Sequence, residues 1–129
     1  MNRKWSAVVV FSAAFGLAAA TPSQGPRLTS VMREKLQHTQ KILEAVVTSD
    51  WVGLEANSRE LERLTADPRW MVLKYPEYAQ HSTAFVQTVQ DLHRAAAQRD
   101  LEMAPKAYVA VTLQCVECHR YLARQRMAK

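Results

Sequence analysis

The sequence predicts an all-α protein folded as an antiparallel four-helix bundle. Three observations support this prediction. The 129 residues include only 3 glycines and 5 prolines, and good helix formers such as Ala, Leu, Glu, Gln, Arg and Lys dominate. Apolar residues recur at steps of three and four in four segments, and short breaks separate these segments. A chain of this length forms one domain with its own core.

Residues 1–20 have the pattern of a secretory signal peptide. Arg3 and Lys4 precede sixteen residues without charge, and residues 18–20 are all alanine, which suits a signal peptidase. A membrane anchor is the alternative, but so short and alanine-rich a stretch is marginal for spanning about 30 Å of hydrocarbon. We therefore expect a periplasmic protein with no stable membrane insertion after cleavage. Residues 21–28 would form a short tether, and residues 29–129 the helical domain.

The charge balance does not indicate a nucleic-acid partner. The net charge is +5, and it falls to +3 without residues 1–20, which contain two basic residues and no acidic one. The sequence has no block of Lys and Arg, and its basic residues do not alternate with aromatic ones.

The first two helices are predicted from caps and apolar stripes. The first should begin near Thr29 or Ser30, since either can cap a helix N-terminus. Its stripe, at helical steps, is Met32, Leu36, Thr39, Leu43 and Val46. Residues 48–50 end this helix and supply a cap for the next. The second helix should run over residues 51–65 and stop at Asp67-Pro68. Its inward residues would be Trp51, Leu54, Leu61 and Leu64.

Residues 69–75 are predicted to form a crossover loop, which Trp70 packs onto the bundle. The third helix opens with Pro76, whose missing N–H is harmless in a first turn. This helix has the most regular stripe of the chain: Tyr78, Ser82, Phe85, Val89, Leu92 and Ala96. Residues 98–100 form the next break.

The fourth helix is predicted over residues 101–125. Pro105 costs little if the helix begins near Met103. The inward stripe is Leu101, Ala104, Tyr108, Val111, Cys115, Cys118 and Leu122. It includes the only two cysteines of the chain, and His119 lies on the same side, four residues after Cys115.

Cys115, Cys118 and His119 form a C-x-x-C-H motif, the sequence signal for covalent attachment of a c-type haem. Two thiols add across the two haem vinyl groups to form thioethers, and the imidazole of the next residue can bind the iron. Because both cysteines are on the inward stripe, haem attached here would point into the bundle. Export agrees with the motif, since c-type haem is attached on the outer side of the membrane.

Other uses of these side chains remain open. A redox dithiol needs its C-x-x-C at a helix N-terminus, where the thiol pKa is lowered, whereas this motif lies deep in a helical pattern. In a zinc site, adjacent Cys118 and His119 fit one tetrahedron poorly. The fourth zinc ligand would have to be an isolated His38, His81 or His93. A disulfide would close a loop too small to add much stability.

The position of the motif restricts the axial ligands. In common small cytochromes the motif is near the N-terminus and a methionine well downstream is the sixth ligand. Here only Met127 follows the motif, on the same helix, and it cannot reach the opposite haem face. Any sixth ligand must therefore come from upstream.

With its signal peptide, four helical segments and terminal C-V-E-C-H-R-Y-L-A-R, the chain resembles the cytochrome c prime family of class II c-type cytochromes. The resemblance extends over about residues 28–126. It implies a left-handed bundle, often a homodimer, with haem between the helices. Cys115 and Cys118 would attach the haem, and His119 would be the proximal ligand. The family usually has a basic residue four after this histidine, where this chain has Ala123 with Arg120 and Arg124 nearby.

The resemblance makes the first helix decisive for function. Some members present an apolar residue to a five-coordinate iron, which is open to NO and CO. Others present a methionine, which makes the iron six-coordinate and suited to electron transfer. Met32 and Leu36 are both candidates here, and we favour Met32 because its thioether can reach in from one turn away. Core packing is the alternative role for Met32. His38 is a third candidate, although we expect it, like His81 and His93, to be exposed or hydrogen-bonded.

We therefore expect a monohaem c-type cytochrome that exchanges single electrons with redox partner proteins and is not an enzyme. A gas-binding haem protein is the alternative, and a helical protein with a zinc or dithiol site at the motif is the alternative without haem. Met71 and Met103 are expected to pack. The aromatic residues expected in the core or at the haem edge are Trp51, Trp70, Tyr78, Phe85 and Tyr108.

Overall fold

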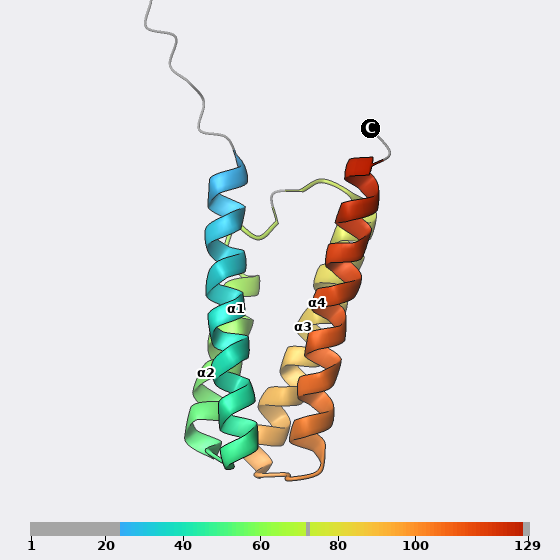
Figure 1. The fold of residues 1–129 in the computed structure, drawn as a ribbon. Helices are drawn as coiled ribbons and strands as arrows, with labels where there is room; N and C mark the ends of the chain where they lie inside the picture. The colour runs from blue at the N-terminus through green and yellow to red at the C-terminus, as the bar shows by residue number, and fades with distance from the viewer. Residues whose placement is uncertain (1–23, 72, 128–129) are drawn as a thin grey trace, which may run out of the picture.

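The computed structural model describes residues 24–71 and 73–127, which form four α-helices. These are α1 (Gln24–Thr48), α2 (Trp51–Thr65), α3 (Pro76–Gln98) and α4 (Met103–Met127). Each helix runs antiparallel to the one before it, and the described residues contain no strand (Figure 1). The predicted all-α antiparallel four-helix bundle is confirmed. The predicted signal peptide lies outside the described residues.

Helix α1 begins earlier than expected. It starts at Gln24, so Thr29 and Ser30 lie inside the helix and do not cap it. Residues 24–28, expected as part of a tether, are helical. Pro26 does not prevent this because it falls in the first turn, where its missing N–H has no intrahelical partner to lose.

The predicted inward face of α1 is correct in part, because Thr39 is buried and Met32 and Val46 pack against the core from half-buried positions. The residues that are buried are Val31, Lys35, Thr39, Ile42 and Ala45. Leu36 and Leu43, both predicted to face inward, are 57% and 46% exposed. The physical reason is that α1 packs closely on α2 and only sparsely on α4. The buried face is therefore turned toward α2. Because Lys35 lies in the middle of this face, apolar periodicity in the sequence does not reveal it.

The predicted faces of the other helices are confirmed with small changes. In α2 the predicted leucines are buried together with Ser58, and Trp51 packs against the core from a half-buried position. All six predicted residues of α3 are buried. The residues of the predicted α4 stripe are buried or half-buried, except for Leu101, which precedes the helix and is exposed. Asp50 and Asp100 cap α2 and α4 through hydrogen bonds from the N–H groups of Gly53 and Met103.

The loop between α2 and α3 packs on the bundle through Trp70, as predicted. The Trp70 indole is buried, stacks on Phe85 with ring centroids 5.4 Å apart, and donates a hydrogen bond to Ser82 Oγ. The Tyr78 hydroxyl donates to the Trp70 carbonyl. These contacts fix the loop against α3. Met71, expected to pack, is instead 50% exposed, and Met103 is 49% exposed.

Asp67 and Arg69 attach the same loop to α1. Arg69 forms an ion pair with the Asp67 carboxylate at 2.6 Å and donates a hydrogen bond to Ser30 Oγ at 3.0 Å. The Arg69 side chain and backbone N–H both donate hydrogen bonds to the Asp67 carboxylate. These two interactions lower the pKa of Asp67 from 3.8 to about 2. A carboxylate with a lowered pKa in the folded state stabilises the fold above its ordinary pKa, and that contribution is lost as the pH falls toward the folded value.

We therefore expect Asp67→Asn to lower the free energy of unfolding at neutral pH and to have little effect near pH 2. Asparagine resembles the protonated carboxyl group, so the variant and the parent converge once Asp67 is protonated. Urea unfolding followed by circular dichroism at both pH values measures the difference. An equal loss of stability at both would contradict the assigned role of the carboxylate charge.

Candidate functional site

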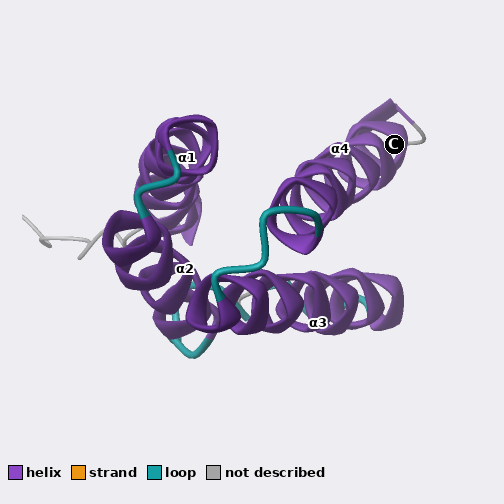
Figure 2. Cartoon of the chain, turned by 90° about the horizontal axis from the view of Figure 1, so that it is seen from below, coloured by secondary structure: helices purple, strands orange, loops and turns teal. Residues whose placement is uncertain are grey.

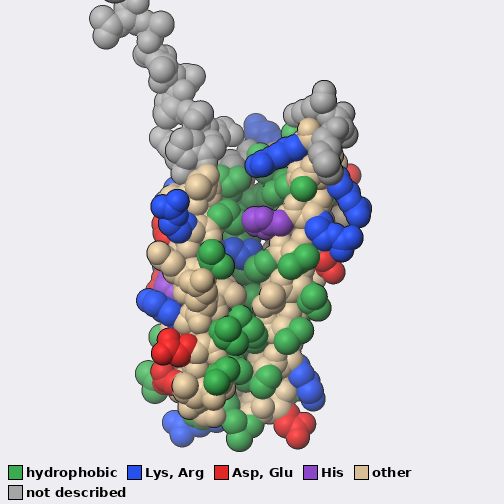
Figure 3. Space-filling view, in the orientation of Figure 1, with side chains coloured by type: hydrophobic (Ala, Val, Ile, Leu, Met, Phe, Trp, Pro, Cys, Tyr) green, Lys and Arg blue, Asp and Glu red, His purple; other side chains and the backbone are tan. Residues whose placement is uncertain are grey.

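A cavity of about 430 Å³ lies in the half of the bundle that contains the N-terminal part of α1 and the C-terminal part of α4. Its volume is within the range of roughly 300–1,000 Å³ found for ligand pockets. Figure 3 shows the hollow between these two helices, with apolar side chains and a histidine in it. The cavity is lined by Leu28, Thr29, Met32, Lys35, Trp70, Tyr78, His81, Ser82, Phe85, Gln114, Cys118, His119, Leu122, Ala123 and Arg126.

The cavity forms because α1 and α4 diverge. They lie close to their other neighbours, but their mutual packing is sparse (Figures 1 and 2). The rest of the bundle is filled by an apolar core, in which Ile42, Leu54, Leu92 and Val111 are completely buried. Between the N-terminal part of α1 and the C-terminal part of α4, the cavity has room for a bound group.

Helix α4 presents the motif to this space. Cys115 and Cys118 are free, half-buried thiols; Cys115 packs against the core and Cys118 lines the cavity. His119 also lines the cavity and is exposed to solvent. Steps of three and four residues repeat on one helix face, so the continuous stripe from Val111 to Leu122 places the motif there. The predicted placement of the motif on the inward face of the last helix is confirmed.

The environment of the motif does not favour a reactive dithiol. The cysteines lie well inside α4, which begins at Met103, so the helix N-terminus is too far away to stabilise a thiolate. Burial raises the pKa of Cys118, with a smaller opposing effect from Lys35. Residues 24–71 and 73–127 contain no group of three or more His, Cys, Asp or Glu side chains that could together hold a metal ion.

Helix α1 forms the facing wall, with Met32 as its sulfur-bearing residue. Met32 is half-buried and lines the cavity, whereas Leu36 does not line it. Leu36 is therefore not placed to face a bound group, contrary to the alternative expectation.

The register of the two helices can be read from Lys35 of α1, which lies close enough to Cys115 and Cys118 of α4 for their sulfurs to oppose the lowering of its pKa. The helices are antiparallel, so moving four residues along α4 to His119 corresponds to moving about four residues back along α1. Met32 is the cavity-lining residue nearest that level. Met32 and His119 line the same cavity from the two facing helices.

Lys35 is a cavity residue that the sequence analysis missed. It is only 7% exposed, and its Nζ lies 3.5 Å from the centroid of the Phe85 ring and 4.7 Å from that of a Trp70 ring. Burial lowers the pKa of Lys35, and the nearby Cys115 and Cys118 sulfurs oppose this effect. The available signal was its helical spacing with Val31, Thr39 and Ile42.

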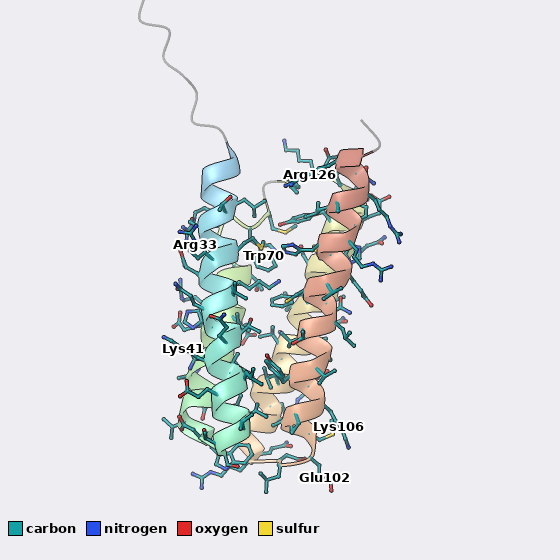
Figure 4. The ribbon with its side chains drawn as sticks, in the orientation of Figure 1. Arg33, Lys41, Trp70, Glu102, Lys106 and Arg126 are labelled. Atoms are coloured by element: carbon teal, nitrogen blue, oxygen red, sulfur yellow. The ribbon has the colours of Figure 1, made fainter. Side chains whose placement is uncertain are left out.

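Aromatic side chains from α3 and the preceding loop form the back wall. Trp70, Tyr78 and Phe85 line the cavity, and Figure 4 shows Trp70 between α1 and α4. Burial raises the pKa of Tyr78 to about 12, so the hydroxyl remains a neutral donor. The other two predicted aromatics, Trp51 and Tyr108, pack against the core cluster instead.

The remaining histidines separate into two groups. His81 lines the cavity and lies against the Tyr121 ring, with centroids 5.3 Å apart. His38 is hydrogen-bonded to Asn57 on α2 and does not line the cavity, so it is not a distal candidate. His93 lies 3.7 Å from Glu62. His38 and His93 were both expected from the sequence to be exposed or hydrogen-bonded.

One polar atom on the cavity wall lacks a partner. The amide oxygen of Gln114 is buried and accepts no hydrogen bond among the described residues, although its amide nitrogen contacts Glu117 at 3.3 Å. Buried polar atoms are nearly always satisfied, so this oxygen fits a wall that a bound group completes. Apolar surfaces, two thiols, an imidazole and a thioether together fit a covalently held haem.

The fold and the site define a class of protein: a four-helix bundle with a cavity between its first and last helices and a C-x-x-C-H motif on the cavity side of the last. A solved structure titled cytochrome c′ has the same fold. The two chains superpose with a TM-score of 0.66 and 22% sequence identity, over 76% of this chain and 92% of that chain. The resemblance inferred from the sequence is thus confirmed for the fold.

Comparison at the sequence level adds no relative. No family model and no curated protein matches this chain. Among the helices in the described residues, none has the length and apolar character needed to cross a membrane.

Proposed function

We propose that the protein is an exported c-type cytochrome of the cytochrome c prime type, and that it carries single electrons through one covalently bound haem. The observation that carries this proposal is the pairing of two cavity walls. Cys118 and His119 line one wall and Met32 lines the other, with Cys115 beside the core. The shared fold with a protein titled cytochrome c′ supports the same class.

Each residue has a defined task in this proposal. The Cys115 and Cys118 thiols would hold the haem by each adding across a vinyl double bond, with the sulfur bonding to one carbon and the thiol proton going to the other. His119 would supply an imidazole nitrogen to the iron, and Met32 a thioether from the facing helix. When bound, the haem iron supplies a centre that changes by one electron between ferric and ferrous states.

The rest of the wall keeps this site apolar. Trp70 and Phe85 are buried and stacked on the α3 side of the cavity, where they would cover a bound haem. A buried, apolar site limits solvent reorganisation and retains the soft thioether ligand. Periplasmic location remains a prediction of the signal-peptide pattern, redox partner proteins remain a prediction of the electron-transfer function, and a homodimer remains a prediction of the resemblance.

Binding of NO or CO is the second candidate, because the sparse packing of α1 on α4 gives small molecules a route to the cavity. The two functions differ in whether Met32 occupies the sixth position. A six-coordinate iron is low-spin, whereas an open five-coordinate iron is high-spin and binds CO directly.

The proposal is tested on protein matured with the haem-attachment machinery. We expect haem staining of the band after denaturing electrophoresis, because only covalent haem survives the gel. We also expect a low-spin visible spectrum with a weak far-red thioether-to-iron band in the ferric state. An unstained band would refute the haem proposal. A stained band with a high-spin spectrum that responds to CO would instead support gas binding.

A further inference from the structure

Among the described residues, Lys35 is the one charged residue that is buried. No carboxylate within the described ranges forms an ion pair with it. An unpaired buried cation is costly unless its surroundings compensate for lost water. Here the compensation comes from the faces of Phe85 and Trp70, whose π-systems attract a cation. The aromatic back wall therefore holds a positive charge inside the cavity.

The position of this charge follows from its contacts. Lys35 lies near both cysteines of the motif, whose sulfurs oppose the lowering of its pKa by burial. Its ammonium group lies against the Phe85 and Trp70 rings. Lys35 would therefore lie beside the haem edge that carries the thioether bonds.

We propose that Lys35 is a positioned positive charge beside the haem, which raises the haem reduction potential without binding the iron. This inference rests on the proposed function. On reduction the iron gains one electron from an external donor, no bond is formed or broken, and the charge of the site falls by one unit. A nearby cation stabilises the more negative, ferrous state. Its effect is strong because a buried site has a low effective dielectric constant and is little screened by salt.

The matched test compares Lys35→Met with Lys41→Met. Methionine has a similar length without the charge, and uncharged residues often replace buried charges without loss of stability. Lys41 is on the same helix but exposed, and Figure 4 shows it on the outer side of α1. The midpoint potential of the haem protein is measured by spectroelectrochemical titration at low and high ionic strength. Lys35→Arg, which keeps the charge, is measured in parallel.

We expect Lys35→Met to lower the midpoint potential while the low-spin spectrum and the far-red band stay unchanged. The shift should persist at high salt, and Lys35→Arg should restore most of the parent potential. Lys41→Met should cause a much smaller shift that salt removes. Lys35→Gln gives the same measurement if the methionine variant folds poorly.

Two results would overturn the inference. An unchanged midpoint potential in Lys35→Met or Lys35→Gln would show that the ammonium charge does not act on the haem. Loss of the low-spin spectrum in these variants would show that Lys35 is itself a ligand or holds one in place. Failure of the proposed function has a separate signature, since the parent protein would then show no haem stain or no low-spin spectrum.

Discussion

Replacing both cysteines, in a Cys115→Ser, Cys118→Ser variant, is expected to abolish haem staining after denaturing electrophoresis completely. Serine is close in size to cysteine, so the half-buried positions are retained while both thiols are removed. Without thiols no thioether bond to haem can form, and any haem that remains in the cavity is held only by the His119 and Met32 ligands and by packing. Such haem dissociates when the chain is denatured. The measurement is the ratio of haem stain to protein stain in the band.

A matched control lies between the two cysteines. Val116 and Glu117 are exposed and do not line the cavity, so a Val116→Ala, Glu117→Gln variant should stain as the parent does. This control keeps the spacing of the motif and changes only the outer face of the helix. Stain that survives in the double serine variant, or is lost in the control, would contradict attachment through Cys115 and Cys118.

Replacing Met32 with alanine is expected to convert the haem from low-spin to high-spin and to remove the far-red band. The thioether is the only ligand that the α1 wall offers near the level of His119, so its loss opens the sixth position. The midpoint potential should fall, because thioether ligation raises it, within the roughly 0.8 V range that axial ligands span. CO affinity should rise about tenfold or more, since the competing ligand is gone.

Leu36→Ala is the natural control for this variant. Leu36 is one turn from Met32 on the same helix, yet it is 57% exposed and lies outside the cavity. Its replacement should leave the spectrum, the potential and CO binding unchanged. If Met32→Ala kept the low-spin spectrum, Met32 would be a packing residue. If Leu36→Ala changed the spectrum, the register of α1 against α4 would be wrong.

Much of the bundle could be predicted because its signals are local. All six residues predicted for the stripe of α3 are buried, only the buried Ala95 was not predicted, and Pro76 marks the first turn. The position of the motif could be predicted for the same reason, because the spacing of Cys115 and Cys118 fits the inward stripe of α4. A residue's place in a helical repeat depends only on the sequence, so these features needed no knowledge of the neighbouring helices.

The wall that faces the motif could not be predicted in the same way. On α1 the sequence offers two stripes that share Thr39, and Leu36 and Leu43 of the more apolar one are exposed. The other has Lys35 at its centre. Charged residues are rarely buried, and a search for apolar periodicity therefore rejects this stripe. Aromatic rings from α3 and the preceding loop make its burial possible, and their position is a tertiary property.

The sequence by itself determined the four helices, their antiparallel order and the inward placement of Cys115, Cys118 and His119. Helical repeat, turn residues and connection length are sufficient for these features. Only the tertiary structure decided that Met32 lines the same cavity as His119, that Leu36 lies outside this cavity and that Lys35 lines it. The physical reason is that α1 packs closely on α2 and sparsely on α4, so that Val31, Lys35 and Ile42 are buried in place of Leu36 and Leu43.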